Sequence, residues 1–251
     1  MTLFLTLYFF ILGTILGSFY NVVGLRLPKG DLFKESRSHC PNCHHTLQWY
    51  ELVPIVSFLL QKGRCRNCKK KISSVYPIME ALSGMTFALS FYLFGFQVEL
   101  VLALLLMSLF HMIVVADFAY MVIPDRLLLF FLPLFIVYRV IDPLDPWWAS
   151  LIGGAVGLFL TAAIILLSKG GMGGGDMKLF GLIGFVLGWK LLLVTYFLST
   201  LIGAMVSWGL LAAGVIERKK PIPFGPFIVL GASFAFFSGR IIIDWYLQTF
   251  F

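Results

Sequence analysis

The chain of 251 residues is 60% hydrophobic and only 12% charged, whereas a typical soluble domain is about 25% charged. This composition excludes a water-soluble globular protein, because one core cannot bury so much apolar surface, and it predicts an integral membrane protein. The formal net charge is +7, and ten of the nineteen Lys and Arg residues lie between residues 26 and 71. Such a stretch can bind nucleic acid, but between membrane spans it indicates a cytoplasmic loop, so we expect no nucleic-acid partner.

Apolar segments that could span a membrane recur along the chain. The first, residues 1–23, lacks the basic start of a signal peptide, so we expect a retained transmembrane helix. A polar loop over residues 24–76 follows. The remaining residues contain seven further apolar segments: 77–96, 98–116, 127–141, 148–167, 179–190, 191–215 and 224–248. The predicted fold is therefore all-α, a polytopic membrane protein of about eight transmembrane helices. Only Trp189 and Lys190 mark the turn between the segments 179–190 and 191–215, the sixth and seventh predicted spans when the first helix is counted.

The distribution of positive charge orients these spans in the lipid bilayer. Because loops rich in Lys and Arg stay in the cytoplasm, residues 24–76 are predicted to be cytoplasmic, which places the N-terminus outside. The loops at 117–126, 168–178 and 217–221 are then also inside, and each of them contains Lys or Arg. We expect a multi-pass protein of the inner or plasma membrane.

All four cysteines lie in the basic loop, as "CPNC" at 40–43 and "CRNC" at 65–68, with twenty-one residues between the two pairs. Two close pairs of thiolates can surround one Zn2+ tetrahedrally, and such a closed site is structural because no coordination position stays open. Two disulfides are the alternative, but they need an oxidising compartment. We expect a small cytoplasmic zinc-binding loop domain with the ligands Cys40, Cys43, Cys65 and Cys68. The histidines beside the first pair are potential substitutes: His39, His44 and His45.

Four acids lie at the cytoplasmic ends of predicted spans: Glu80, Asp117, Asp125 and Asp176. A carboxylate at the centre of a span costs about 2.5–3.5 kcal/mol, so acids in or near spans are candidate functional residues. Asp117 ends the third span and Asp176 opens the sixth. Two close carboxylates that cannot both ionise could form an aspartyl protease dyad. The alternative is a pair of ordinary helix-end acids facing headgroup water, and spacing alone does not decide between the two. Asp125 follows Pro124, where we expect it to cap the next helix.

A glycine-rich stretch, "GMGGGD" at 171–176, leads into the second of the proposed dyad acids. It cannot be a stable helix interior, because each glycine destabilises a helix by about 0.8–1 kcal/mol relative to alanine, and it lacks the order of a Walker loop. Glycine permits positive φ and close backbone approach, so an extended substrate peptide could lie beside Asp176. We expect substrate binding and positioning by Gly173, Gly174, Gly175, Asp125 and Lys178.

Six motifs cover nearly the whole chain in order: "GSFYNVVGLRLP" (17–28), the paired CxxC motifs, "ISSVYPIMEALSG" (72–84), "ADFAYMVIPDRL" (116–127), "GMGGGDMKLFGLIG" (171–184) and "PIPFGPF" (221–227). Together they resemble the motifs of the type IV prepilin peptidases, a family of membrane aspartyl proteases with a GxGD motif. Tyr20 is a departure, because leucine is common there in the family.

The resemblance implies a bifunctional enzyme that acts on prepilins or pseudopilins, as in type IV pili. Asp117 and Asp176 fall on the family's catalytic aspartates, and Asp125 falls on a nearby non-catalytic acid. Such enzymes remove a short basic leader at the cytoplasmic face, and many then methylate the new N-terminal amine with S-adenosylmethionine. The implied organisation is a first helix (1–23), a zinc-binding loop that is also the candidate methyltransferase region (24–76), and an aspartyl peptidase domain of about seven helices (77–251).

The methyltransferase site is the less defined half of this interpretation. The sequence has no glycine-rich nucleotide-binding fingerprint of the soluble kind. Glu80 is the candidate for binding the substrate amine, although it could instead pair with Lys or Arg at the membrane edge. Other classes of function stay open on sequence alone: a polytopic transporter with a structural zinc loop, because glycine-broken helices with intramembrane acids are transporter features, and a zinc-dependent scaffold without catalysis. The sequence does not indicate an oligomeric state.

Overall fold

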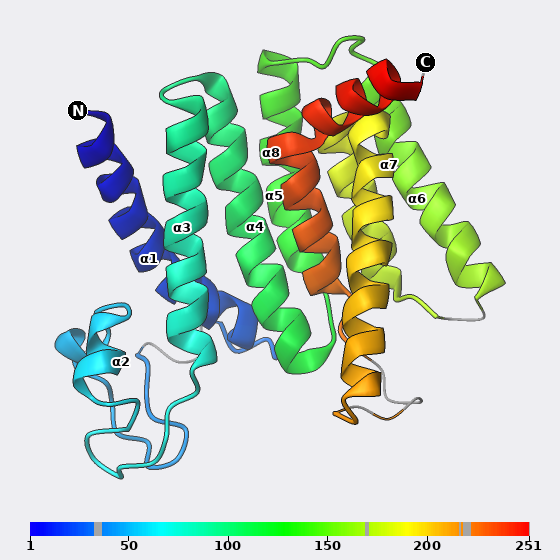
Figure 1. The fold of residues 1–251 in the computed structure, drawn as a ribbon. Coiled ribbons are helices and arrows are strands. Elements are labelled where there is room, and N and C mark those ends of the chain that lie inside the picture. The colour runs from blue at the N-terminus through cyan, green and yellow to red at the C-terminus, as the bar shows by residue number, and fades with distance from the viewer. Residues whose placement is uncertain (33–36, 169–170, 216, 218–221, 251) are drawn as a thin grey trace. The chain divides into compact units, whose positions relative to one another are not determined.

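The computed structural model describes residues 1–251 except 33–36, 169–170, 216, 218–221 and 251 (Figure 1). The described residues form helices and no strand: α1 (Thr2–Arg26), η1 (Trp49–Glu51), α2 (Val56–Leu60), α3 (Val75–Phe94), α4 (Val98–Tyr120), α5 (Asp125–Ile141), α6 (Ala149–Leu167), α7 (Gly174–Ala212) and α8 (Gly225–Phe250). Five of these helices are long and apolar enough to cross a membrane: α1, α3, α4, α6 and α7. The predicted all-α membrane fold is confirmed.

Helix α7 is a helical hairpin and not one straight helix. Gly188 interrupts it with φ 80° and ψ 167°, a conformation that glycine adopts without strain. The rings of Phe180 and Tyr196 stack with centroids 3.9 Å apart, although sixteen residues of straight helix would separate them by about 24 Å. The two halves therefore run antiparallel, and the chain reverses one residue before the predicted turn. With α7 counted as two, the described residues contain eight long helical segments, the expected number.

The chain divides into two compact units, Met1–Ala116 and Asp117–Phe251. In the first unit, α1 packs against α3 through glycines that leave no room for a side chain: a Cβ on Gly13 would lie 2.6 Å from the carbonyl oxygen of Ser83. The rings of Phe9 and Phe91 stack further along the same pair of helices, with centroids 4.6 Å apart. The three-part division expected from the sequence, at residues 23 and 76, stays a prediction.

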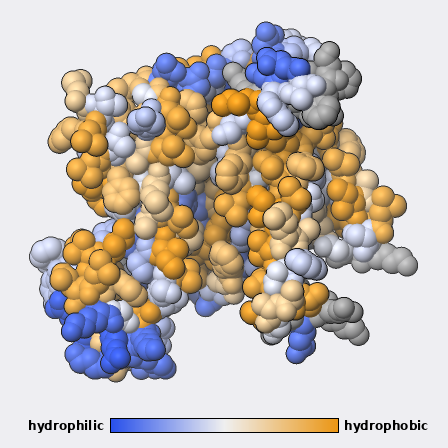
Figure 2. All heavy atoms as spheres, viewed as in Figure 1, coloured by the Kyte–Doolittle hydropathy of each residue, from blue (hydrophilic) through white to orange (hydrophobic). Residues whose placement is uncertain are grey.

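In the second unit, α6 packs along the first half of the α7 hairpin, again through glycines on both helices. The hairpin corner is bound to α5, because the Nε of Arg139 donates to the carbonyl oxygen of Val186 at 2.8 Å. Many large apolar side chains point outward from the helices, and Phe159 is 75% exposed. Figure 2 shows hydrophobic residues over most of the helical surface, as expected of helices whose outer faces contact lipid.

Candidate active site and metal site

The two cysteine pairs form the same turn twice in the first unit. The backbone N–H of His44 donates to the carbonyl oxygen of Cys40 at 2.9 Å, and the N–H of Lys69 donates to that of Cys65 at 3.0 Å. His44 and Lys69 each follow the second cysteine of a pair, and both have positive φ, 55° and 59°. The repetition of one turn geometry presents two pairs of sulfurs in the same way, which is the arrangement of a pair of zinc knuckles.

The four sulfurs gather into one cluster. The Sγ atoms of Cys40 and Cys68 are 3.8 Å apart, those of Cys43 and Cys65 are 3.9 Å apart, and all four lie within 4.8 Å of one another. A disulfide would need about 2.05 Å, whereas a tetrahedron around Zn2+ with Zn–S bonds of about 2.3 Å has edges of about 3.8 Å. The cysteines are free, and their spacing fits a tetrahedral metal ion.

Backbone donors prepare two of these thiols for metal binding. The backbone N–H of Lys70 lowers the pKa of the Cys68 thiol to about 6, and the backbone N–H of Asn42 lowers that of Cys40. A lowered thiol pKa favours the thiolate, which is the form that binds metal. Within the described residues the metal-competent cluster consists of the cysteines alone. The neighbouring histidines, which the sequence offered as substitutes, are therefore not part of it.

Glu51, which the sequence analysis did not single out, joins the two knuckles. Its carboxylate is buried and accepts the backbone N–H of Gln48 at 2.9 Å. His45, from the first knuckle, lies 3.4 Å from one carboxylate oxygen, and Arg66, from the second, lies 4.0 Å from the other. The sequence did contain an indication of this role, because Glu51 is an acid within a strongly basic loop and therefore has many potential partners of opposite charge.

The two aspartates of the proposed dyad lie in the second unit, each held by the amide of another residue. Asp117 is in the last turn of α4, and its Oδ2 accepts the backbone N–H of Gly225 at 2.8 Å. Asp176 is the third residue of α7, and its Oδ2 accepts the backbone N–H of Gly173 at 2.9 Å. Both carboxylates are buried and close enough for their charges to interact. The Asp117 carboxylate therefore lies at the N-terminal end of α8 and the Asp176 carboxylate at that of α7, where the helix dipole stabilises negative charge.

The glycines before Asp176 differ from the expectation in one respect. None of Gly173, Gly174 and Gly175 has positive φ; the last two are the first helical residues of α7. A close approach does occur at Gly175, to the segment between α4 and α5, because a Cβ there would lie 3.0 Å from the Cβ of Ile123. Around Gly174, by contrast, a Cβ would meet nothing within 4 Å. Close packing therefore accounts for glycine at position 175, and a left-handed backbone accounts for none of the three.

Gly225 is the residue of the candidate site that sequence reasoning missed. It is the first residue of α8 and lies 108 positions after the aspartate to which it donates. A Cβ on Gly225 would lie 2.7 Å from the Oδ2 of Asp117, so only glycine allows this approach. The signal available in the sequence was a glycine between aromatic and proline residues in "PIPFGPF", at the start of an apolar helix.

Asp125 does not cap α5 as expected. Pro124 occupies the capping position with an extended backbone, and no side chain makes a cap hydrogen bond. The Oδ2 of Asp125 instead accepts the Nζ of Lys178 at 2.6 Å, and both side chains are about half exposed. An exposed pair contributes only about 0.2–1 kcal/mol. Its effect is to join the N-terminal ends of α5 and α7, the second of which positions Asp176.

Glu80 lies in the first unit, on α3, and is buried, as are the polar residues Asn21 of α1 and Ser83 of α3. The Oε2 of Glu80 accepts the backbone N–H of Ile55 at 2.8 Å. This partner is a loop amide and not the basic side chain that the sequence offered as an alternative. The Oδ1 of Asn21 and the hydroxyl of Ser83 are buried without a hydrogen-bond partner.

Comparisons with known proteins agree with this division into a cysteine-containing and an aspartate-containing part. Residues 11–94 match the bacterial peptidase A24 N-terminal domain, and residues 103–208 match the type IV leader peptidase family, so the chain is of the membrane peptidase class. It is 44% identical over 239 residues to a prepilin leader peptidase/N-methyltransferase of Bacillus subtilis, covering 95% of this chain and 96% of the relative.

Further relatives carry the same name. Identity is 34% over 256 residues to one of Vibrio cholerae, with 93% and 97% of the two chains covered, and 31% over 274 residues to one of Aeromonas hydrophila, with 96% and 93% covered. No solved structure matches the chain. The chain belongs to the type IV leader peptidase family.

Proposed function

We propose that Asp117 and Asp176 form an aspartyl dyad that removes the leader peptide of a prepilin or pseudopilin. One observation carries the proposal: two buried carboxylates from different helices lie together in one compact unit, each oriented by a backbone N–H. Ordinary helix-end acids facing water would not be buried in this way. The relatives named prepilin leader peptidase/N-methyltransferase support the substrate class, and family membership favours a peptidase over a transporter.

The chemistry follows from two close carboxyl groups of which only one ionises. The ionised carboxylate takes a proton from a water molecule, whose oxygen attacks the carbonyl carbon of the scissile peptide bond. The protonated carboxyl group donates a hydrogen bond to the carbonyl oxygen, which stabilises the tetrahedral intermediate. When the C–N bond breaks, the departing nitrogen receives a proton from the dyad. The products are a leader ending in a carboxylate and a mature chain with a new N-terminal amine.

The dyad is assigned to the cytoplasmic face of the cell membrane, and the N-terminus to the outside. The support is the positive-inside rule: residues 26–71 carry ten basic side chains and belong on the cytoplasmic side. The helix order then brings the start of α7 and the end of α4 to that same side. A leader rich in positive charge also stays in the cytoplasm by this rule, so substrate and dyad meet at one face.

The zinc assignment rests on the sulfur geometry. Zn2+ held by Cys40, Cys43, Cys65 and Cys68 leaves no open coordination position, so its contribution is structural. It would fix the segment between the two knuckles, since a loop of this size has little apolar core of its own.

A second activity, methylation of the new amine, is assigned to two buried polar residues of the first unit, Glu80 and Asn21. Glu80 and Asn21 present carboxylate and amide oxygens, which fit an amine donor. When bound, S-adenosylmethionine supplies the methyl group. Glu80 and Asn21 would orient the amine and, through Glu80, accept the proton that methylation releases. The relatives' printed name supports this activity, and the candidate domain is the region before residue 94.

Purified enzyme in proteoliposomes, mixed with a prepilin and S-adenosylmethionine, tests both activities by mass spectrometry. Asp176→Asn should yield no cleaved product but should still methylate a substrate that is supplied without its leader. Glu80→Gln should cleave and not methylate, whereas Glu99→Gln, the same change at an exposed acid, should do both. If the Asp176→Asn variant still cleaves the leader, the proposed dyad is refuted. If the Glu80→Gln variant still methylates, the proposed amine site is refuted.

A further inference from the structure

The segment between the two zinc knuckles exposes an apolar patch, defined here as Trp49, Val56, Leu59 and Leu60. Their exposed fractions are 78%, 50%, 66% and 74%. The patch belongs to η1 and α2, which lie outside the spanning helices. Figure 2 shows hydrophobic residues over the part of this segment nearest the helices of the first unit and hydrophilic residues over its far end. Large apolar side chains grouped on a polar loop indicate a surface that something covers.

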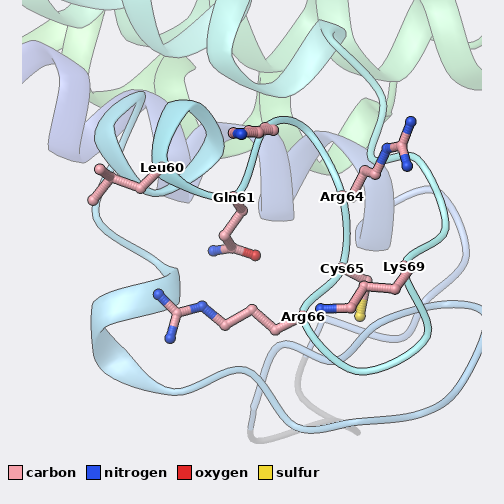
Figure 3. Close-up of a pocket in the computed structure, with 7 residues that line it drawn as sticks. Leu60, Gln61, Arg64, Cys65, Arg66 and Lys69 are labelled. Atoms are coloured by element: carbon pink, nitrogen blue, oxygen red, sulfur yellow. The ribbon is translucent and has the colours of Figure 1, made fainter.

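A basic pocket adjoins the patch, and Leu60 belongs to both. It is lined by Leu60, Gln61, Lys62, Arg64, Cys65, Arg66 and Lys69, so none of the seven lining residues is acidic. In Figure 3 the Gln61 side chain lies above that of Arg66, and Lys69 lies beside Cys65. The guanidinium of Arg66 is also held over the ring of Tyr50, 4.9 Å from its centroid. Four of the lining side chains are cationic, and one of them, Arg66, also lies 4.0 Å from the carboxylate of Glu51, so the pocket carries an excess of positive charge that attracts an anion.

A hydrogen bond sets the level of this segment along the spanning helix α3. The residue before α2 is Ile55, and its backbone N–H donates to Glu80 at 2.8 Å. Glu80 is the sixth residue of α3, about 7.5 Å along the helix axis from its first residue. Ile55 has φ 60°, an unusual value for a β-branched residue. The surrounding contacts, which include the hydrogen bond to Glu80, therefore hold Ile55 in this conformation. The start of α2 is thus at the depth of the second turn of α3 and not away in the solvent.

We propose that η1 and α2 lie on the membrane surface and that the basic pocket binds the phosphate groups of anionic phospholipids. The depth of Ile55 brings the patch to the headgroup region, where Trp and Leu side chains enter the boundary of the acyl chains. Lys62, Arg64 and Arg66 then meet lipid phosphates, and each basic side chain near an anionic surface raises the local lipid affinity about fivefold. This surface site uses no residue of the proposed peptidase dyad, and it shares with the proposed methyltransferase site only Glu80, the acceptor that sets the depth of α2.

The test uses the full chain in nanodiscs, with Trp49 as its single tryptophan. The other five are changed to phenylalanine: Trp147, Trp148, Trp189, Trp208 and Trp245. Fluorescence of Trp49 is quenched with brominated phosphatidylglycerol or with brominated phosphatidylcholine at the same mole fraction in otherwise identical mixed discs. Both lipids should quench, and the anionic lipid should quench more strongly because it is enriched at the pocket.

The measured quantity is the excess of Trp49 quenching by brominated phosphatidylglycerol over quenching by brominated phosphatidylcholine. The double variant Lys62→Gln/Arg64→Gln should lower this excess by at least about fivefold. Lys62→Arg/Arg64→Lys should retain it, because charge is what the pocket supplies. The matched control Arg126→Gln/Lys190→Gln removes two positive charges elsewhere and should leave the excess unchanged. Bound zinc of about one ion per chain verifies that each variant keeps its loop.

Three results would overturn the proposal. If neither lipid quenches Trp49, the segment does not lie on the membrane. Equal quenching by both lipids would refute the anionic site. Finally, Trp49 could be shielded from the aqueous quencher iodide only when a second copy of the chain or added prepilin is present. That result would show that a protein, and not lipid, covers the patch.

Discussion

Replacing Gly225 by alanine tests whether a backbone amide positions the proposed catalytic Asp117. The substitution keeps the chain helical, because alanine is the better helix former. It adds only a Cβ, which would lie 2.7 Å from the Oδ2 of Asp117 and 3.1 Å from its Cγ. Such contacts are too short, so the carboxylate must move away from the amide that now holds it at 2.8 Å.

The size of the effect follows from that displacement. Ordinary contact begins at 3.4 Å, so the carboxylate oxygen must retreat by about 0.7 Å, the difference between 3.4 and 2.7 Å. A misplacement of about 1 Å reduces catalysis about 10²-fold. The hydrogen bond to a charged acceptor, worth about 1.5–3 kcal/mol, is weakened at the same time. We therefore expect kcat/KM for leader cleavage to fall about 10²-fold, while the protein stays inserted in the membrane and loaded with metal.

The assay is cleavage of a prepilin in proteoliposomes, normalised to the amount of inserted enzyme. Gly209→Ala is the matched control, because it is the same change in a helical residue whose added Cβ would meet nothing within 4 Å. It should cleave at the wild-type rate within about twofold. Wild-type activity in Gly225→Ala would refute the reasoning, since it would show that the contact with Asp117 does not set the position of a catalytic group.

Three further predictions concern the dyad, the glycines and the metal. Asp117→Asn and Asp176→Asn should each abolish leader cleavage, while Asp125→Asn keeps substantial activity because its partner lies outside the dyad; the reverse pattern in the same assay would reassign the catalytic pair. Gly175→Val should abolish cleavage in correctly inserted enzyme, because even its Cβ would lie 3.0 Å from a neighbouring side chain, and full activity would mean that the glycines are only a flexible linker. Metal analysis should find about one zinc ion per chain. Cys65→Ser should lose zinc and loosen the loop, seen as faster limited proteolysis, before it affects cleavage; zinc-free protein with disulfide-bonded sulfurs would contradict this.

The sequence by itself determined the features that depend on near neighbours. Spans of about twenty apolar residues can only be stable as helices in lipid, so their number could be predicted from composition and length. Two CxxC pairs predict a metal cluster because each pair forms its own turn, as the repeated backbone hydrogen bonds of Cys40 and Cys65 show. The glycine run also distinguished Asp176 from the other acids of the chain, because glycines destabilise a helix interior and so require another explanation.

Only the tertiary structure decided what depends on residues distant in the chain. Asp117 receives its orientation from Gly225, 108 residues later, and no local pattern connects the two. The sequence offered both positive φ and close backbone approach as reasons for the glycines before Asp176; at Gly175 the backbone is not left-handed, and the close neighbour is Ile123. Asp125 had the position of a helix cap and instead pairs with Lys178 of α7. In each case the deciding contact lies between elements that meet only when the helices pack, and their packing depends on side-chain volume and close backbone approach, which the order of residues does not reveal.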